Sequence, residues 1–119
     1  MGIATKGGGI IDPVMSRALN AFGKKVALRY ALAKLVLFGS RARGDGRVDS
    51  DADVAVVLGE AHGDFMHTKL EMADMAFDVL LETGVLIQPL PIWEDEWSHP
   101  EAYWNPRLLE NIQREGIAL

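Results

Sequence analysis

Apolar residues recur along this chain at two different spacings, and the spacings divide it into helices and strands. Helical spacing runs through residues 13–33, 64–83 and 105–116. Short, nearly continuous apolar runs, typical of strands buried in a layered sheet, occupy residues 34–39, 51–58 and 85–93. The predicted order is helix, strand, loop, strand, helix, strand and helix, which indicates an α/β domain.

Capping residues set the ends of the predicted helices. Asp12 and Asn105 each precede a proline, a pattern typical of an N-cap followed by the first helical residue. Gly84 follows the second helical stretch and suits its C-terminal cap. Pro89 and Pro91 remove backbone donors from the third strand, so we expect that strand either to lie at an edge of the sheet or to end its ladder pairing early. The closing Gly-Ile-Ala-Leu is expected to return to the sheet edge.

Length and composition favour one compact domain. Residues 1–9 are rich in glycine, so we predict a flexible leader followed by a single domain over residues 10–119. The chain has no cysteine, which excludes disulfides, thiolate metal sites and a cysteine nucleophile. A formal net charge of −5 argues against nucleic acid as a primary partner. With neither a secretory signal nor an apolar run of membrane-spanning length, we expect a cytoplasmic protein without a membrane partner.

The end of the first strand carries a candidate anion site. Gly39 allows a ligand to approach the backbone closely, and Ser40 supplies a hydroxyl. The following residues can begin a short helix, whose first N–H groups and dipole favour a phosphate. Arg41, Arg43 and Arg47 form a basic cluster in an otherwise acidic chain. The alternative is an ordinary turn, with Ser40 as an N-cap and solvated arginines.

Two carboxylates open the next strand. Asp51 and Asp53 are two residues apart, so the alternation of a strand points both toward one face, about 6–7 Å apart. Such a pair repels unless a cation lies between the two groups. Mg²⁺ suits it, because this ion accepts one or two carboxylates and completes its shell with water and phosphates. The alternative is that acids merely end a loop, as we expect for the neighbouring Asp49.

In combination, the two features resemble a known signature. Residues 38–58 are similar to the motif of the DNA polymerase β-like nucleotidyltransferase superfamily. The similarity lies in "GSRARG", the polar loop that follows it, and "SDADVAVVL". The details resemble its small branch, the minimal nucleotidyltransferases, which includes MNT-type antitoxins paired with HEPN-type toxins. The resemblance implies a small mixed β-sheet packed with helices.

It also implies roles for individual residues. Gly39, Ser40 and Arg43 would bind a nucleoside triphosphate, with ATP as the expected one. Asp51 and Asp53 would be the catalytic ligands of Mg²⁺ or Mn²⁺. The implied reaction is attack on the α-phosphate, with transfer of a nucleoside monophosphate such as AMP to a hydroxyl. The acceptor would lie on a partner, for example a HEPN-type helical protein, or on a second copy in a homo-oligomer.

The sequence departs from the family at its third carboxylate. The family has an acid near the start of the third strand, where this chain offers Leu86 or Gln88. Asp74, Asp78 and Glu94 are possible substitutes, and spacing selects none of them.

Four functions therefore remain open. The first is a metal-dependent nucleotidyltransferase, and the second is a weakly active or inactive antitoxin or interaction module on the same fold. A sugar-nucleotide enzyme would need a longer chain and leave the Gly-Ser turn unused. A regulatory domain without a ligand would leave the aspartate pair unexplained.

Overall fold

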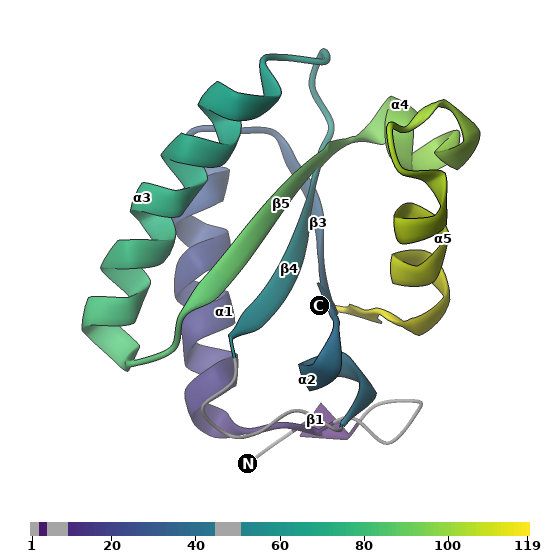
Figure 1. Ribbon diagram of the computed structural model, residues 1–119. Helices are drawn as coiled ribbons and strands as arrows, with labels where there is room; N and C mark the ends of the chain where they lie inside the picture. Colours follow the sequence, from purple (N-terminus) through teal and green to yellow (C-terminus); the bar gives the residue numbers. More distant parts are fainter. Residues whose placement is uncertain (1–2, 5–9, 45–50) are drawn as a thin grey trace.

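A four-stranded mixed sheet forms the centre of the protein. The computed structural model describes residues 3–4, 10–44 and 51–119 (Figure 1). Strand β3 (Leu32–Phe38) lies antiparallel to β4 (Ala52–Leu58) on one side and to the short β6 (Ile117–Ala118) on the other. Strand β5 (Ile87–Trp93) runs parallel to β4, which gives the order β5-β4-β3-β6. The edge position expected for the proline-containing strand and the return of the C-terminus to the sheet are both confirmed.

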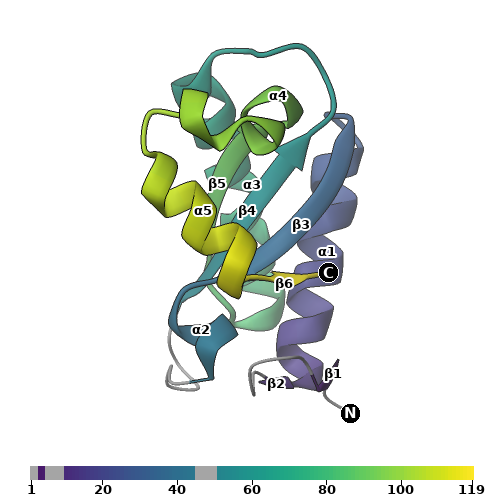
Figure 2. The ribbon, with the colours of Figure 1, turned by 90° about the vertical axis from the view of Figure 1, so that its right-hand side faces the viewer.

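Helices cover both faces of this sheet. Helices α1 (Pro13–Ala27) and α3 (Phe65–Thr83) lie side by side on one face, while α5 (Pro106–Glu115) covers the other (Figures 1 and 2). The short helices α4 (Glu94–Ser98) and η2 (Pro100–Ala102) connect β5 to α5. The α/β fold with a small mixed sheet and helices packed on it, predicted from the sequence, is confirmed.

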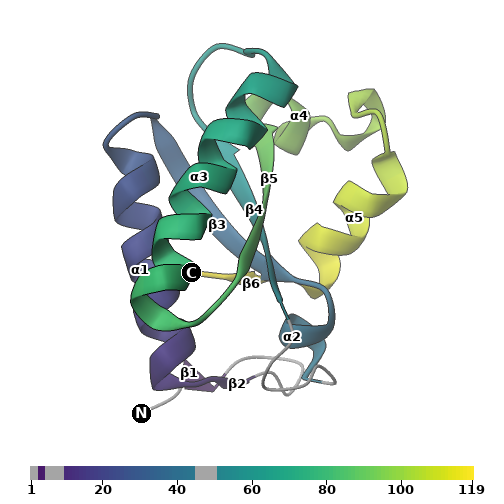
Figure 3. The same ribbon diagram turned by 60° about the vertical axis from the view of Figure 1, so that its left-hand side comes forward.

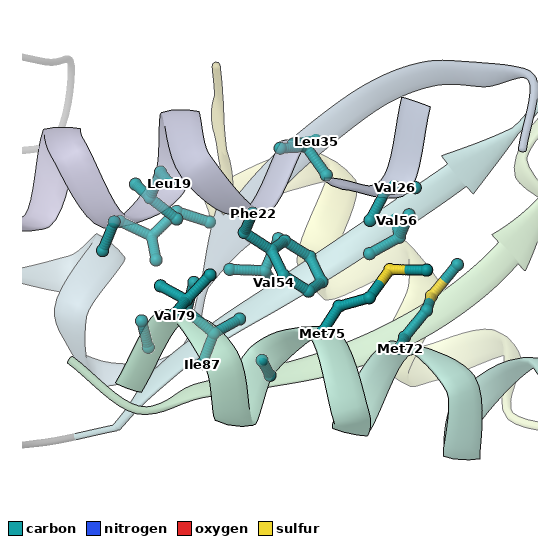
Figure 4. Packing of buried hydrophobic residues seen from close by; sticks show 14 of the residues in the cluster. Leu19, Phe22, Val26, Leu35, Val54, Val56, Met72, Met75, Val79 and Ile87 are labelled. Atoms are coloured by element: carbon teal, nitrogen blue, oxygen red, sulfur yellow. The ribbon is translucent and has the colours of Figure 1, made fainter. Parts of the chain in front are cut away.

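The double coverage explains the long apolar run in β4. Its side chains alternate between a large core under α1 and α3 and a smaller core under α5. Val54 and Val56 enter the large core with Phe22 and Met72 (Figure 4), whereas Ala55 enters the smaller one. A strand buried on both faces gains stability from apolar residues at every position, so it lacks the polar alternation of a half-exposed strand.

The predicted caps are in place. Asp12 Oδ1 accepts a hydrogen bond from the Met15 backbone N–H at 2.7 Å, and Asn105 Oδ1 accepts one from Leu108 N–H at 3.2 Å. Gly84 ends α3 with a φ of +80°, which favours glycine. These bonds satisfy N–H groups that the first helical turn leaves without a partner.

Two parts of the sequence prediction need correction. Helix α1 ends at Ala27, so the predicted helix over 13–33 was wrong beyond that residue. Leu32 instead begins β3 and pairs with Leu58, because ladder pairing overrides a spacing that fits both element types. The short helices after Trp93 were not predicted.

The N-terminal segment contains a short ribbon. Strands β1 (Ile3–Ala4) and β2 (Ile10–Ile11) pair antiparallel. Residues 1–2 and 5–9 lie outside the described part of the chain, so the flexible leader over 1–9 and the boundary at residue 10 stay predictions. Among the described residues, no helix has both the length and the apolar character needed to span a bilayer.

Candidate functional site

The Gly-Ser turn lies directly against the aspartate strand. Gly39 connects β3 to the short helix α2 (Ser40–Arg43), with φ +76° and ψ −157°, a region that essentially only glycine adopts. A Cβ added at Gly39 would overlap the carboxylate oxygen Oδ2 of Asp53. Glycine at this position therefore serves both the backbone conformation and the close approach of the turn to Asp53.

The alternative interpretation of Ser40 as an N-cap is wrong. Gly39 occupies the N-cap position of α2, and no side chain caps this helix. Ser40 is the first helical residue, and its half-buried side chain is not used as a cap. A role for Ser40 other than capping is consistent with this geometry.

The two aspartates differ in environment. Asp51 is exposed just before β4, whereas Asp53 is half-buried as the second residue of the strand. Burial raises the pKa of Asp53 above its ordinary value, and the negative charge of Asp51 raises it further. The nearby guanidinium of Arg43 opposes these effects by lowering the same pKa. The pair thus concentrates negative charge at a site where a cation would be stabilised.

Gln88 is the residue that the third strand brings to the aspartates. It is the register partner of Asp53 across the parallel β4–β5 pair. Its side-chain Nε2 donates a hydrogen bond to Asp51 Oδ2 at 3.1 Å. Leu86 contributes only its backbone carbonyl here, which accepts the Ala52 N–H at 2.9 Å. The choice between Leu86 and Gln88, left open by the sequence, is decided in favour of Gln88.

The three substitute acids lie elsewhere. Asp74 and Asp78 are on α3 and line a groove beside α1, while Asp53 projects to the α5 face with its cross-strand partner Phe38. Glu94 follows the far end of β5, near Gly59. Within residues 3–4, 10–44 and 51–119, no three histidine or acidic side chains gather as a metal site.

A hollow on the α5 face adjoins the Gly-Ser turn. It has a volume of about 230 Å³. Gly39 and Arg43 form one wall, and Asn111 and Glu115 from the C-terminal part of α5 form another. Sequence reasoning missed the α5 residues, because only the packing of α5 on the sheet brings them to the turn. Arg47 and Asp49, which were considered from the sequence, lie outside the described residues.

Comparison with known proteins gives a family for this chain. A family model described as a nucleotidyltransferase domain matches residues 15–117. The chain belongs to the nucleotidyltransferase domain family.

Individual relatives are distant. A Methanocaldococcus jannaschii protein named as a candidate protein adenylyltransferase is 29% identical over 105 residues, which cover 87% of this chain and 95% of that protein. A crystal structure of a candidate nucleotidyltransferase from Sulfolobus solfataricus is 20% identical, with a TM-score of 0.46. That alignment covers 73% of this chain and 79% of the other.

Proposed function

We propose that this nucleotidyltransferase-family protein transfers a nucleoside monophosphate, AMP, from ATP to a hydroxyl group on a partner protein. The observation that carries the proposal is the contact between the Gly39 turn and Asp53, with Asp51 beside it. This contact puts a turn suited to phosphate next to a carboxylate pair suited to a divalent cation. Together they match the requirements of phosphoryl transfer, in which positioning and charge neutralisation supply most of the catalysis.

The aspartate pair fits Mg²⁺ or Mn²⁺. Asp51 and Asp53 offer hard oxygen ligands, and the raised pKa of Asp53 reflects negative charge in a partly desolvated place. A magnesium site commonly has one or two protein carboxylates, with substrate phosphates and water completing the shell. When bound, the ion would neutralise charge on the phosphates and favour departure of pyrophosphate.

The remaining residues hold and orient the nucleotide. Gly39 lets the phosphates approach the backbone, Ser40 offers its hydroxyl, and Arg43 offers its guanidinium along the wall of the hollow. The hydrogen bond from Gln88 fixes the carboxylate of Asp51. The acceptor oxygen would form a bond to the α-phosphorus as the bond to pyrophosphate breaks, and the hydroxyl proton would pass to water.

Two lines support AMP and a protein acceptor. The M. jannaschii relative is named for adenylyl transfer to protein. The net charge of −5 disfavours nucleic acid as the acceptor. A HEPN-type helical protein, suggested by the sequence signature, is the first acceptor to test.

A second candidate function is favoured by Gln88. Its neutral amide occupies the position next to the aspartates where the family resemblance implies an acid. An amide can neither act as a general base nor match the affinity of a carboxylate for a divalent cation. A module that binds metal and nucleotide, with transfer slow or absent, therefore remains the alternative.

Calorimetry tests binding first. We expect ATP to bind in the presence of Mg²⁺, and binding to be lost with EDTA or in the Asp51→Asn, Asp53→Asn double variant. Absence of ATP binding by the native chain in Mg²⁺ and in Mn²⁺ would refute the proposed function.

Radiolabel transfer then separates the two candidates. An acceptor protein should become labelled by ATP carrying the label in the α-phosphate and stay unlabelled when the label is in the γ-phosphate. Binding without any transfer, to a helical partner or to the chain itself, would favour the binding module.

A further inference from the structure

Helix α3 carries a second apolar face, directed away from the protein. Met66 and Leu70 are each 59% exposed, Phe77 is 55% exposed and Leu81 is 71% exposed. On a helix of 3.6 residues per turn these four residues fall within an arc of about 60°. We call them the outer stripe.

The fold does not account for the outer stripe. The buried side of α3, which includes Met72, Met75 and Val79, packs toward α1 and the sheet from roughly the opposite side of the helix. A surface helix normally has one apolar face and a polar outer face. Figure 3 shows that α3 lies on the outside of the molecule, along the whole length of its layer. The outer stripe is therefore available to another protein chain.

We propose that the outer stripe is the interface of a homodimer, in which α3 of one copy packs antiparallel against α3 of a second copy. This proposal goes beyond the proposed function and does not depend on it. In the antiparallel arrangement the stripe is complementary to itself, as a two-fold interface requires. Met66 lies opposite Leu81 of the second copy, and Leu70 lies opposite Phe77. Ala73, close to the midpoint, is small enough for the two helices to approach closely.

The area is sufficient for a dimer. The exposed parts of the four side chains amount to about 500 Å² per copy, which is at the upper end for an apolar patch on a monomer. Two such patches would bury on the order of 1,000 Å², the lower limit for a specific interface between proteins. If the second copy covers the whole stripe, these four side chains alone bring the interface to that limit.

Charges on α3 favour the antiparallel over the parallel direction. The N-terminal half of the helix carries His67, Lys69 and the partly buried Glu71, whose carboxylate is paired with His67, so this half is close to neutral. The C-terminal half carries only acids, Asp74, Asp78 and Glu82. Antiparallel packing places the acidic half of each helix against the nearly neutral half of the other, whereas parallel packing would bring the two acidic halves together. One exception is Asp74, which lies near the two-fold axis, where it meets Asp74 of the second copy.

The arrangement leaves both active sites accessible. The outer stripe is on the helical layer opposite α5, whereas the aspartates and the hollow face α5 (Figure 1). A dimer through α3 would therefore present two separate sites on its outer surfaces. Loss of the dimer is expected to leave ATP binding unchanged, which separates this proposal from the proposed function.

Sedimentation equilibrium of the full chain tests the dimer. We expect the native protein to dimerise at micromolar to submillimolar concentration. Leu70→Glu and Phe77→Glu should each weaken dimerisation by about a hundredfold or more, because each places a charge in an apolar contact. The matched control is Trp104→Glu, a 69% exposed aromatic residue between η2 and α5, which should leave the dimer intact. Circular dichroism would show that each variant remains folded.

A second pair of variants tests the direction of packing. Asp74→Asn should tighten the dimer about two- to threefold, because it removes a like-charge contact near the axis. Asp78→Asn, one turn further from the axis, should not tighten it. A native chain that is monomeric at every concentration would overturn the proposal and leave the stripe to a different protein. A dimer unaffected by both glutamate variants would also overturn it.

Discussion

Replacing Gly39 with alanine tests whether the turn and the aspartate strand depend on each other. At φ +76° and ψ −157° the backbone of Gly39 is in a region that side chains rarely allow. The added Cβ would also overlap Oδ2 of Asp53. The substitution therefore combines backbone strain with a displaced carboxylate.

The expected destabilisation is the sum of two contributions. Backbone strain at such a position costs about 1–3 kcal/mol. Overpacking against a neighbour that can move only partly costs a further ~1–3 kcal/mol. We therefore expect Gly39→Ala to lower the free energy of unfolding by about 2–6 kcal/mol. It should also weaken Mg²⁺-dependent ATP binding, because Asp53 must move.

Gly84→Ala provides the matched control. Gly84 also has a positive φ of +80°, but a Cβ there would meet no atom within 4 Å. Its ψ of 3° places it in the ordinary left-handed region, where a side chain costs about 1–2 kcal/mol. This variant measures strain without the overlap and should leave ATP binding unchanged.

Urea unfolding and calorimetry of the two variants decide the question. Gly39→Ala should have the lower unfolding midpoint and the weaker ATP binding. If the two variants were equally stable and bound ATP equally, the close contact between the turn and Asp53 would have no energetic or functional consequence. The structural basis of the proposed site would then be wrong.

Two further substitutions test other parts of the molecule. Without metal, Gln88→Asp should lower the thermal midpoint, since it replaces the hydrogen bond to Asp51 with a like charge. The same variant should bind Mg²⁺ about tenfold more tightly, or by about 1.4 kcal/mol. A metal at the aspartates would be contradicted if Mg²⁺ raised the midpoint of this variant no more than that of the native protein or of the control Gln88→Leu. Tyr30→Phe should lower the midpoint by a few degrees at neutral pH, because the Tyr30 hydroxyl, in the turn after α1, donates a hydrogen bond to Glu71 on α3. Burial, followed by the Glu71 contact, raises the pKa of Tyr30 from 10.0 to about 12, so the stabilisation by this tyrosine is complete below pH 10 and disappears as the pH rises toward 12. Thermal unfolding of both proteins over this range should show the difference in midpoint shrinking above pH 10, and a difference that stayed constant would contradict the assigned pKa.

Local sequence signals were enough for the three long helices and the three long strands, apart from the end of α1, and for the Gly-Ser turn and aspartates of the site. Asp12 and Asn105 are caps because their short side chains reach N–H groups three residues ahead, and this depends only on neighbouring residues. Gly39 and the aspartates could be recognised together because the turn and the strand are close in sequence. The apolar runs of β3 and β4 indicated burial on both faces before any tertiary contact was known.

The remaining residues of the candidate site come from chain segments that are distant in sequence. Gln88 and Asp51 are 37 residues apart, and only the register of the parallel pair β4–β5 places one beside the other. Asn111 and Glu115 reach the turn because α5 packs across the second face of the sheet. The end of α1 also depended on tertiary structure, since pairing of Leu32 with Leu58 determines where the helix must give way to strand. Sequence by itself determined the local conformations and paired the Gly-Ser turn with the two aspartates. The tertiary structure decided which residues lie beside that turn and those aspartates, because strand register and helix packing arise from contacts between residues far apart in the chain.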